Sequence, residues 1–466
     1  MDTPFCLGCT QRDRRIAELE KNNARLQADC VRLQAQLEEA QRASKRQAAP
    51  FSKGEPNPNP KSTARPRGAN YGKHGHRPRF TDDQIDEILE APLPDCCPHC
   101  GGDVAEDDEV DEQFQEEIPI KPIRRKFRIH KGKCQHCGRR VRGRHPKQTS
   151  DAVGAAASQV GPDAQATIVY LNKHSGMAYG KIADLFERTY GIHLTRSACA
   201  QAVLRAGRRL RPAYEEIKQH IRDAEYLTPD ETGWRLGGHP VWLHAWVAGD
   251  GATCFAIDPR RSADVLEEII GIDWSGNLTH DGFSSYDRFV CAVHQQCVAH
   301  PLRRAHTMVE NAIGRAKDFP CQVIEVFQGA LQVRDQFLAG QLDKAELLRA
   351  HEGYNEDLRE LSSRPRDNEA NERFAKHLNK YTGAWFMFLV DPSIPATNYL
   401  GEQALKVPIV NRKVWGGNRT PAGQKAQEVN SSVIATCRKR LLNATTFISQ
   451  AVCGFVGSLF APGNKG

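Results

Sequence analysis

The sequence predicts a multidomain α/β protein, and three observations support this fold class. The chain has 466 residues, which is too long for one ordinary domain and favours two to four folded units. Its pattern changes from a heptad repeat, through paired cysteines and amphipathic helices, to strands that alternate with helices. Three acids, Asp230, Asp281 and Glu402, stand where apolar strand or helix patterns meet polar residues. Carboxylates in such places are typical ligands of hard divalent cations.

Charge and cysteine content restrict the class of protein. The net charge is +7, but residues 41–80 contain ten Lys/Arg and one acid, a local charge of +9, which leaves −2 for the remainder. A concentrated basic segment suits a polyanion such as nucleic acid, and a solvated linker is an equal alternative. No run of eighteen apolar residues is present, and the first residues lack the apolar centre of a signal peptide. We therefore expect a cytoplasmic protein whose fifteen cysteines are thiols and metal ligands.

Residues 1–44 are predicted to form a coiled-coil helix. Apolar or tolerated residues alternate at spacings of three and four: Ile16, Leu19, Asn23, Leu26, Cys30, Val31 or Leu33, Leu37 and Ala40. An Asn on this seam favours one register and a two-stranded assembly, so we expect a homodimer, with a lone amphipathic helix as the alternative. Residues 45–80 are rich in Pro, Lys, Arg, Asn and Gly without periodicity, and are predicted to be a basic disordered linker.

Residues 90–145 are predicted to form a zinc-binding ribbon. Two Cys-x-x-Cys pairs, each followed by Gly, supply four candidate Zn²⁺ ligands: Cys97, Cys100, Cys134 and Cys137. Gly after the second cysteine lets the chain turn so that backbone N–H groups face sulfur. The segment between the pairs alternates like a pair of strands, and Cys96 is a spare thiol. Four free thiols are the alternative, and Cys6 and Cys9, which have no second pair nearby, are expected to be free.

Residues 160–222 are predicted to be helical. One helix begins near Asp163, a second is ended by Gly191, and a third opens after Thr195 with Ser197 as N-cap. Two helices joined by a short turn suit a helix-turn-helix that binds DNA. Its candidate DNA contacts are Arg196, Arg205 and Arg208. A helical hairpin without DNA is an equal alternative.

Residues 224–425 are predicted to form a catalytic α/β domain. Three strands in a meander, the first bearing Asp230, are followed by a short helix with a Ser cap and a strand that ends at Asp281. A helical insertion is expected over 301–390, a helix with Glu402 after Pro395, and a C-terminal helical segment over 426–466. This order of strands and acids resembles a ribonuclease-H-like fold.

Longer motifs give a family resemblance over nearly the whole chain. The segments PDETGWRLGGHPVWLH, THDGFSSY, CVAHPLRRAH, TNYLGEQALK and RKVWGGNRT resemble those of an insertion-sequence-66 family transposase. The resemblance implies a DDE transposase that cleaves and joins DNA at insertion-sequence ends in the bacterial nucleoid. It implies that Asp230, Asp281 and Glu402 are catalytic and hold two Mg²⁺ or Mn²⁺ ions. Glu231 should point to the opposite face of its strand, away from the metals.

Two parts of the catalytic region qualify this resemblance. The family often has Glu-Arg-Ala-Leu-Arg where this chain has Glu402-Gln403-Ala404-Leu405-Lys406, so a bidentate phosphate contact is lost. Further candidate DNA contacts are Lys406, Arg412, Lys413 and Arg419, the last three around Trp415 and two glycines. A buried Trp with solvated cations is an equal alternative there.

Other interpretations stay open at this stage. His280 and His300 are either ligands or substrate contacts, or, more often in proteins, hydrogen-bonded structural residues. The chain is alternatively a sequence-specific DNA-binding protein with an inactive nuclease domain, although the intact acids argue against that. A ribonuclease-H-like nuclease that does not join strands is a third possibility.

Overall fold

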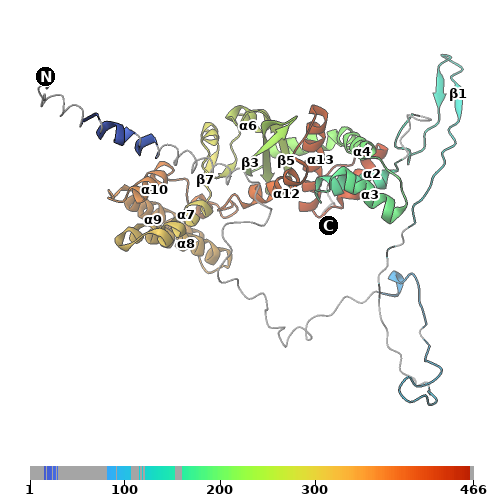
Figure 1. Ribbon diagram of the computed structural model, residues 1–466, viewed down its shortest axis with the longest axis horizontal. Helices are drawn as coiled ribbons and strands as arrows, with labels where there is room; N and C mark the ends of the chain where they lie inside the picture. The colour runs from blue at the N-terminus through green and yellow to red at the C-terminus, as the bar shows by residue number, and fades with distance from the viewer. Residues whose placement is uncertain are drawn as a thin grey trace, which may run out of the picture. The chain divides into compact units, whose positions relative to one another are not determined.

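A computed structural model describes residues 15–29 apart from 17, 24 and 28, residues 81–105 apart from 91, residues 115 and 118, and residues 121–152 and 160–461 (Figure 1). The chain divides into two units, Met1–Ile118 and Pro119–Gly466, and each is described by itself. Within the described ranges, no helix is long and apolar enough to cross a membrane.

The smaller unit contains part of the expected coil. The described residues between 15 and 29 are helical, and the seam residues Ile16, Leu19 and Leu26 are exposed. Self-association through this seam stays a prediction. The rest of the seam, residues 30–44, and the basic linker 45–80 lie outside the described residues. A short 3₁₀ helix, η1 (Asp82–Gln84), precedes the first cysteine pair.

Five strands form the central sheet of the larger unit: β3 (Tyr226–Leu236), β4 (His239–Ala248), β5 (Thr253–Asp258), β6 (Asn277–His280) and β7 (Val293–Gln296). Their order is β5-β4-β3-β6-β7. The first three strands pair antiparallel, whereas β3–β6 and β6–β7 are parallel. The meander, followed by helix α6 (Ala263–Ile270) and β6, confirms the predicted mixed α/β sheet. This sheet is compatible with a ribonuclease-H-like core.

Local chemistry explains the first hairpin. Gly237 and Gly238 connect β3 to β4 with φ of +59° and +90°, the backbone that a two-residue type I′ turn requires. Strand β4 lies second in the sheet, and its residues from Leu243 to Ala248 are buried on both faces. An apolar run without strict alternation is what a doubly covered strand needs.

Strand β7 was not predicted from the sequence. The strand is only four residues long and mostly polar (VHQQ). It therefore shows neither an enrichment in β-branched residues nor an alternation of apolar and polar residues. The structure buries Gln295 and Gln296 in this strand. Gln295 accepts a hydrogen bond from Phe388 N–H at 3.1 Å and donates to the Trp385 carbonyl at 2.8 Å. Tertiary contacts therefore satisfy a polar strand that the sequence pattern does not reveal.

In the described part of the larger unit, four α-helices precede the sheet: α2 (Pro162–Lys173), α3 (Tyr179–Tyr190), α4 (Arg196–Arg209) and α5 (Arg211–Arg222). Gly191 ends α3 in the left-handed conformation, as expected. Two predictions were wrong. The N-cap of α4 is Thr195, whose Oγ1 accepts from Ala198 N–H at 3.0 Å, and Ser197 lies inside the helix. The expected third helix is two helices that break at Leu210, because Pro212 cannot donate to the preceding turn.

The predicted helical insertion between β7 and the glutamate helix is confirmed. It consists of α7 (Ala299–Asn311), α8 (Asp318–Leu338), α9 (Lys344–Ser363), α10 (Glu369–Lys380) and α11 (Met387–Val390), with the 3₁₀ turn η4 (Gly314–Lys317). Figure 1 shows α7 to α10 gathered as one group. They enclose an apolar cluster of their own, centred on Phe327, Phe374 and Trp385.

Three helices end the described chain: α12 (Tyr399–Trp415), α13 (Pro421–Lys439) and α14 (Ala444–Cys453). Helix α13 protects edge strand β5. Alternate backbone N–H groups of the strand donate to side chains four residues apart in the helix: Thr253 to Thr436 at 3.0 Å, Phe255 to Ser432 at 2.9 Å and Ile257 to Glu428 at 3.0 Å. An uncovered edge would present these donors to another chain, so α13 both completes the core and closes the sheet.

The cysteine-bearing segment of the larger unit forms a small ribbon. Strands β1 (Lys131–Lys133) and β2 (Arg140–Arg142) pair antiparallel around the second cysteine pair. The prediction that the segment between the two cysteine pairs forms the strands was wrong for residues 121–130, which contain no strand. The tight turn at Cys134–Gly138 connects β1 directly to β2 and sets their register, so the two segments next to the turn pair with each other.

Candidate functional site

Strands β3 and β6 bring two of the predicted acids to the same part of the sheet. Asp230 lies within β3, and Asp281 follows the last residue of β6. The parallel register pairs Leu227 with Leu278. Continued along both strands, this register sets Asp230 beside Asp281. Asp281 is exposed, and its Oδ1 accepts a hydrogen bond from Phe283 N–H at 3.0 Å, which fixes the turn after the strand.

Helix α12 delivers the third acid. Glu402 is in its first turn, with a side chain 39% exposed. The preceding residue, Gly401, is buried against β3, where a Cβ would lie 2.9 Å from the Thr228 carbonyl oxygen and 3.1 Å from the Cβ of Asp230. Only a residue without a side chain allows this approach. Gly401 therefore sets how near α12 carries Glu402 to the strand.

The acids influence one another electrostatically. Burial, together with the charges of Glu231, Asp281 and Glu402, raises the pKa of Asp230 to about 7, while a hydrogen bond from Glu231 N–H acts in the opposite direction. Among the described residues, neither Asp230 nor Asp281 has an ion-pair partner. The site therefore has a surplus of negative charge, and hard divalent cations with oxygen ligands fit such a donor set.

The three acids are near one another without forming a closed metal site. Within the part of the chain that the structure describes, no three His, Cys, Asp or Glu side chains are close enough to hold a metal ion. The role of Asp230, Asp281 and Glu402 as metal ligands thus stays a prediction. Two neighbouring strands and one helix bring the acids near enough for the charges of Asp281 and Glu402 to act on Asp230.

Glu231 points away from these acids, as the strand alternation predicts. Its carboxylate is 3% exposed and accepts from the Arg261 guanidinium at 2.8 Å and from the Tyr286 hydroxyl at 2.8 Å. Arg261 in turn lies over the rings of Trp242 and Phe283, 4.6 and 4.1 Å from their centroids. Glu231 is therefore a buried acceptor that joins Arg261 and Tyr286 on the opposite face of the strand.

Two histidines adjoin the site in different ways. The Nε2 atom of His300 is 3.8 Å from Glu402 Oε1, and its Nδ1 is buried without a partner among the described residues. His280 is buried, and its Nδ1 accepts from Gly282 N–H at 3.2 Å. Its Nε2 therefore carries the proton and donates to His294 Nδ1 at 3.0 Å. Burial lowers the pKa of His280 to about 3, so it is a neutral structural residue under Asp281.

Sequence reasoning missed His294 and Gly401. His294 lies on the unpredicted strand β7, and its Nε2 donates to the Phe289 carbonyl at 3.0 Å, which completes the chain of hydrogen bonds from Gly282. Gly401 stands next to the predicted glutamate. A glycine in the first turn of a helix is an available signal, because it is unfavourable there unless another backbone comes close.

The candidate DNA contacts are spread over several elements. Arg196, Arg208, Lys406, Lys413 and Arg419 are exposed. Arg205 is partly buried and its Nε lies 3.5 Å from Gln165 Oε1. Arg412 is half-buried beside Gly233, and burial lowers its pKa. Exposed cations on α4 and α12 suit phosphate, whereas Arg205 and Arg412 are partly engaged by the protein itself.

The loop after α12 approaches the protein's own backbone. A Cβ at Gly417 would lie 2.5 Å from the Arg235 carbonyl oxygen, and Asn418 N–H donates to the same carbonyl at 2.9 Å. Trp415 packs edge-on against Trp234 with 5.9 Å between centroids, and the buried Lys173 lies over its ring at 5.1 Å. The close approach expected at these glycines is to the end of β3, and Trp415 is a packing residue.

The two cysteine pairs have the same local geometry. Gly101 and Gly138 adopt φ of +76° and +68°, and each donates its N–H to the carbonyl of the first cysteine in its pair. Backbone N–H groups directed at sulfur lower the pKa of Cys97 and of Cys134. Such N–H groups stabilise thiolates, so each pair fits half of a four-thiolate zinc site. The pairs lie in different units, and Cys96 is exposed.

Comparison with known proteins gives one family match and one relative. The profile of the family described as "Transposase IS66 family" matches residues 157–426, which include the helices before the sheet, the sheet, the insertion and α12. The chain is also similar to "Uncharacterized protein y4hP" of Sinorhizobium fredii (strain NBRC 101917 / NGR234), at 24% identity over 424 residues. That similarity covers 81% of this chain and 73% of the relative.

Proposed function

The chain belongs to the IS66 family of transposases, and from this premise we propose that it catalyses metal-dependent DNA strand cleavage and strand transfer at insertion-sequence ends. The observation that carries the proposal is the convergence of three carboxylates, from β3, β6 and α12, without a cationic side chain of the described chain paired to the two aspartates. Such a group attracts the cations that phosphoryl transfer needs.

Each acid has a proposed role that its position supports. Asp230 and Asp281 come from adjacent parallel strands and would bind a divalent metal ion between them. Glu402 would contribute a further carboxylate ligand from helix α12. Bound Mg²⁺ or Mn²⁺ would supply Lewis acidity at the attacking and leaving oxygens of DNA. His300, 3.8 Å from Glu402 Oε1, would orient that carboxylate. The buried His280 would hold the turn of Asp281 in place.

A single substitution tests the catalytic assignment. Asp230→Asn keeps the size of the side chain and removes the charge, so strand cleavage with Mg²⁺ should fall by at least about 1,000-fold while binding to element ends is kept. Asp273→Asn, on an exposed loop, is the matched control and should cleave like the parent protein. Unchanged cleavage by the Asp230→Asn protein would refute the assignment of Asp230 as a catalytic residue.

Two other functions are separated by the products of the same reaction. A ribonuclease-H-like nuclease without strand joining would release cut DNA and give no joined product from precut ends with free 3′-hydroxyls. A sequence-specific DNA-binding protein with an inactive nuclease domain would bind ends and give neither product. The proposal requires both cleavage and joined DNA.

The two flanking predictions are proposed as supports for this function. Cys97, Cys100, Cys134 and Cys137 would share one Zn²⁺, because both pairs carry the same turn and the first thiol of each, Cys97 and Cys134, has a lowered pKa. Metal analysis of the purified chain should find about one zinc, lost in a Cys134→Ser variant. Residues 1–44 would pair two subunits, and their deletion should halve the mass measured by light scattering. An unchanged mass would refute the coil.

A further inference from the structure

The segment 121–148, called here the basic ribbon, is the most strongly charged described part of the chain. It contains twelve Lys/Arg and no Asp or Glu. It forms strands β1 and β2, the second cysteine turn at their tip, and the extended segments on either side of them. The basic linker 45–80 is less densely charged, and the family match begins beyond the ribbon at residue 157.

The ribbon places like charges directly opposite one another. Lys131 pairs with Arg142 and Lys133 with Arg140, while Gly132 and Val141 face each other between them. Because side chains alternate between the faces of a strand, all four cations lie on one face. All four are exposed, and no described acid forms an ion pair with any of them. Opposed like charges destabilise an isolated ribbon, so this face is arranged for an external anion.

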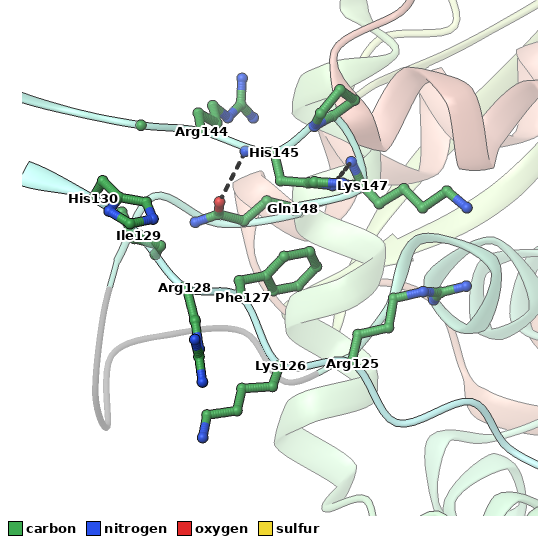
Figure 2. Close-up of a pocket in the computed structure, with 12 residues that line it drawn as sticks. Arg125, Lys126, Phe127, Arg128, Ile129, His130, Arg144, His145, Lys147 and Gln148 are labelled. Carbon is green, nitrogen blue, oxygen red and sulfur yellow. Dashed lines mark hydrogen bonds between the residues drawn. The ribbon is translucent and has the colours of Figure 1, made fainter.

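A hollow at the base of the ribbon extends the same surface. Its volume is about 650 Å³, and Figure 2 shows it between residues 125–130 and 143–148. The cations that line it are Arg125, Lys126, Arg128, Arg144 and Lys147. Two hydrogen bonds hold its shape: Gly143 N–H donates to the His130 carbonyl at 2.9 Å, and His145 N–H donates to the Gln148 side-chain oxygen Oε1 at 3.3 Å. Phe127 and His145 stack obliquely within it at 5.4 Å.

We propose that the basic ribbon is a binding site for the sugar–phosphate backbone of duplex DNA, with Lys131, Lys133, Arg140 and Arg142 as its phosphate contacts. The charge density fits a polyanion with regularly spaced charges, and a two-stranded ribbon is narrow enough to follow a DNA groove. The choice of DNA as the polyanion rests on the proposed function. The contacts are sequence-independent, so the ribbon holds and orients DNA while other elements read the ends.

Salt dependence of binding tests the proposal on the full-length chain. The probe is a fluorescent 30-base-pair duplex of arbitrary sequence, titrated between 50 and 200 mM salt without added Mg²⁺. The slope of log affinity against log salt is negative, and each lost phosphate contact makes it less steep by about 0.9. The variant K131Q/K133Q/R140Q/R142Q should therefore lose about 3 to 4 from the slope, so that over this range the parent's affinity falls on the order of 100-fold more than the variant's.

Three variants control for charge and folding. K131R/K133R/R140K/R142K exchanges the cations and should keep the parent's slope. R315Q/K317Q/R349Q/K376Q removes four exposed cations from the helical insertion and should change the slope by less than about 1. R128Q/K147Q removes two of the five cations that line the hollow without changing the strands, and it should make the slope less steep by about 2 if the hollow continues the phosphate-binding surface, as proposed. This last variant decides the result if the fourfold glutamine variant fails to fold.

The possible results separate clearly. The proposal is supported if the slope becomes less steep for K131Q/K133Q/R140Q/R142Q and for R128Q/K147Q, while R315Q/K317Q/R349Q/K376Q keeps the slope of the parent. Equal losses from ribbon and insertion variants would mean that only net charge matters and would overturn it. Tighter binding of duplex RNA or polyglutamate than of duplex DNA at the same salt would also overturn it. Cleavage by the parent protein with Mg²⁺ is measured separately from the salt slope, so a failure of the catalytic proposal is recognised independently.

Discussion

Gly401 of helix α12 lies directly against Asp230 of strand β3, with space for no side chain between them. A Cβ on the glycine would be 3.1 Å from the Cβ of Asp230 and 2.9 Å from the Thr228 carbonyl oxygen. Because Glu402 is the next residue of the helix, this contact fixes the position of one predicted catalytic acid relative to another. The backbone of α12 is thereby part of the site.

Gly401→Ala should impair catalysis more than binding. The added methyl group would push the first turn of α12 away from β3, and displacements of about 1 Å at a catalytic group lower rates by about 100-fold. We expect that loss in Mg²⁺-dependent cleavage, with the affinity for element ends within about twofold of the parent. The control is Gly353→Ala in α9, where a Cβ meets nothing within 4 Å. That change should keep activity and stabilise the helix by up to about 1 kcal/mol.

Asp230 and Glu231, although adjacent, should have opposite effects on stability. The Asp230 carboxylate is crowded by like charges and burial, so Asp230→Asn should raise the free energy of unfolding by about 1–2 kcal/mol in metal-free protein at pH 8. Glu231→Ala should lower it by about 2–3 kcal/mol, because Arg261 and Tyr286 lose their shared acceptor. Urea unfolding measures both, and a destabilised Asp230→Asn protein would contradict the first expectation.

The buried Lys173 should make stability depend on pH. Its Nζ donates to Gln427 Oε1 at 2.7 Å, and burial lowers its pKa from 10.5 to about 7. Between these values the unfolded chain holds a proton that the folded chain lacks, so the stability contributed at this position rises with pH from 7 to 10.5 and is lower below 7. The free energy of unfolding of the parent, minus that of Lys173→Met, should therefore increase as the pH rises above 7. The increase should approach about 1.4 kcal/mol per pH unit.

Urea titrations at pH 7, 8 and 9 measure this difference. The exposed Lys376 supplies the matched control, because Lys376→Met should give a difference that does not change over this pH range. A flat difference for Lys173→Met would mean that the amine stays charged in the folded protein. Desolvation also lowers the pKa of Lys439, to about 8, but this exposed residue is common to all three proteins, so its contribution cancels.

The sequence allowed part of the site to be predicted because local patterns encode it. Asp230 and Asp281 stand in or after strands whose apolar residues are visible in the sequence, and the Gly-Gly turn after β3 specifies its hairpin. Glu402 depended on the family resemblance, since a helix with one acid in its first turn is common. The break at Leu210 was foreseeable from Pro212, whereas the cap at Thr195 was not distinguishable from one at Ser197.

By itself, the sequence determined the order of elements, the meander with its following helix, the helical insertion and the direction in which Glu231 points. These depend on alternation, capping and turn chemistry, which act over a few residues. Only the tertiary structure decided that the polar VHQQ segment is a strand, that α13 closes the β5 edge, and that Gly417 meets Arg235. Those contacts join residues far apart in the chain, and a buried polar group is stable only where its partner arrives from elsewhere in the fold.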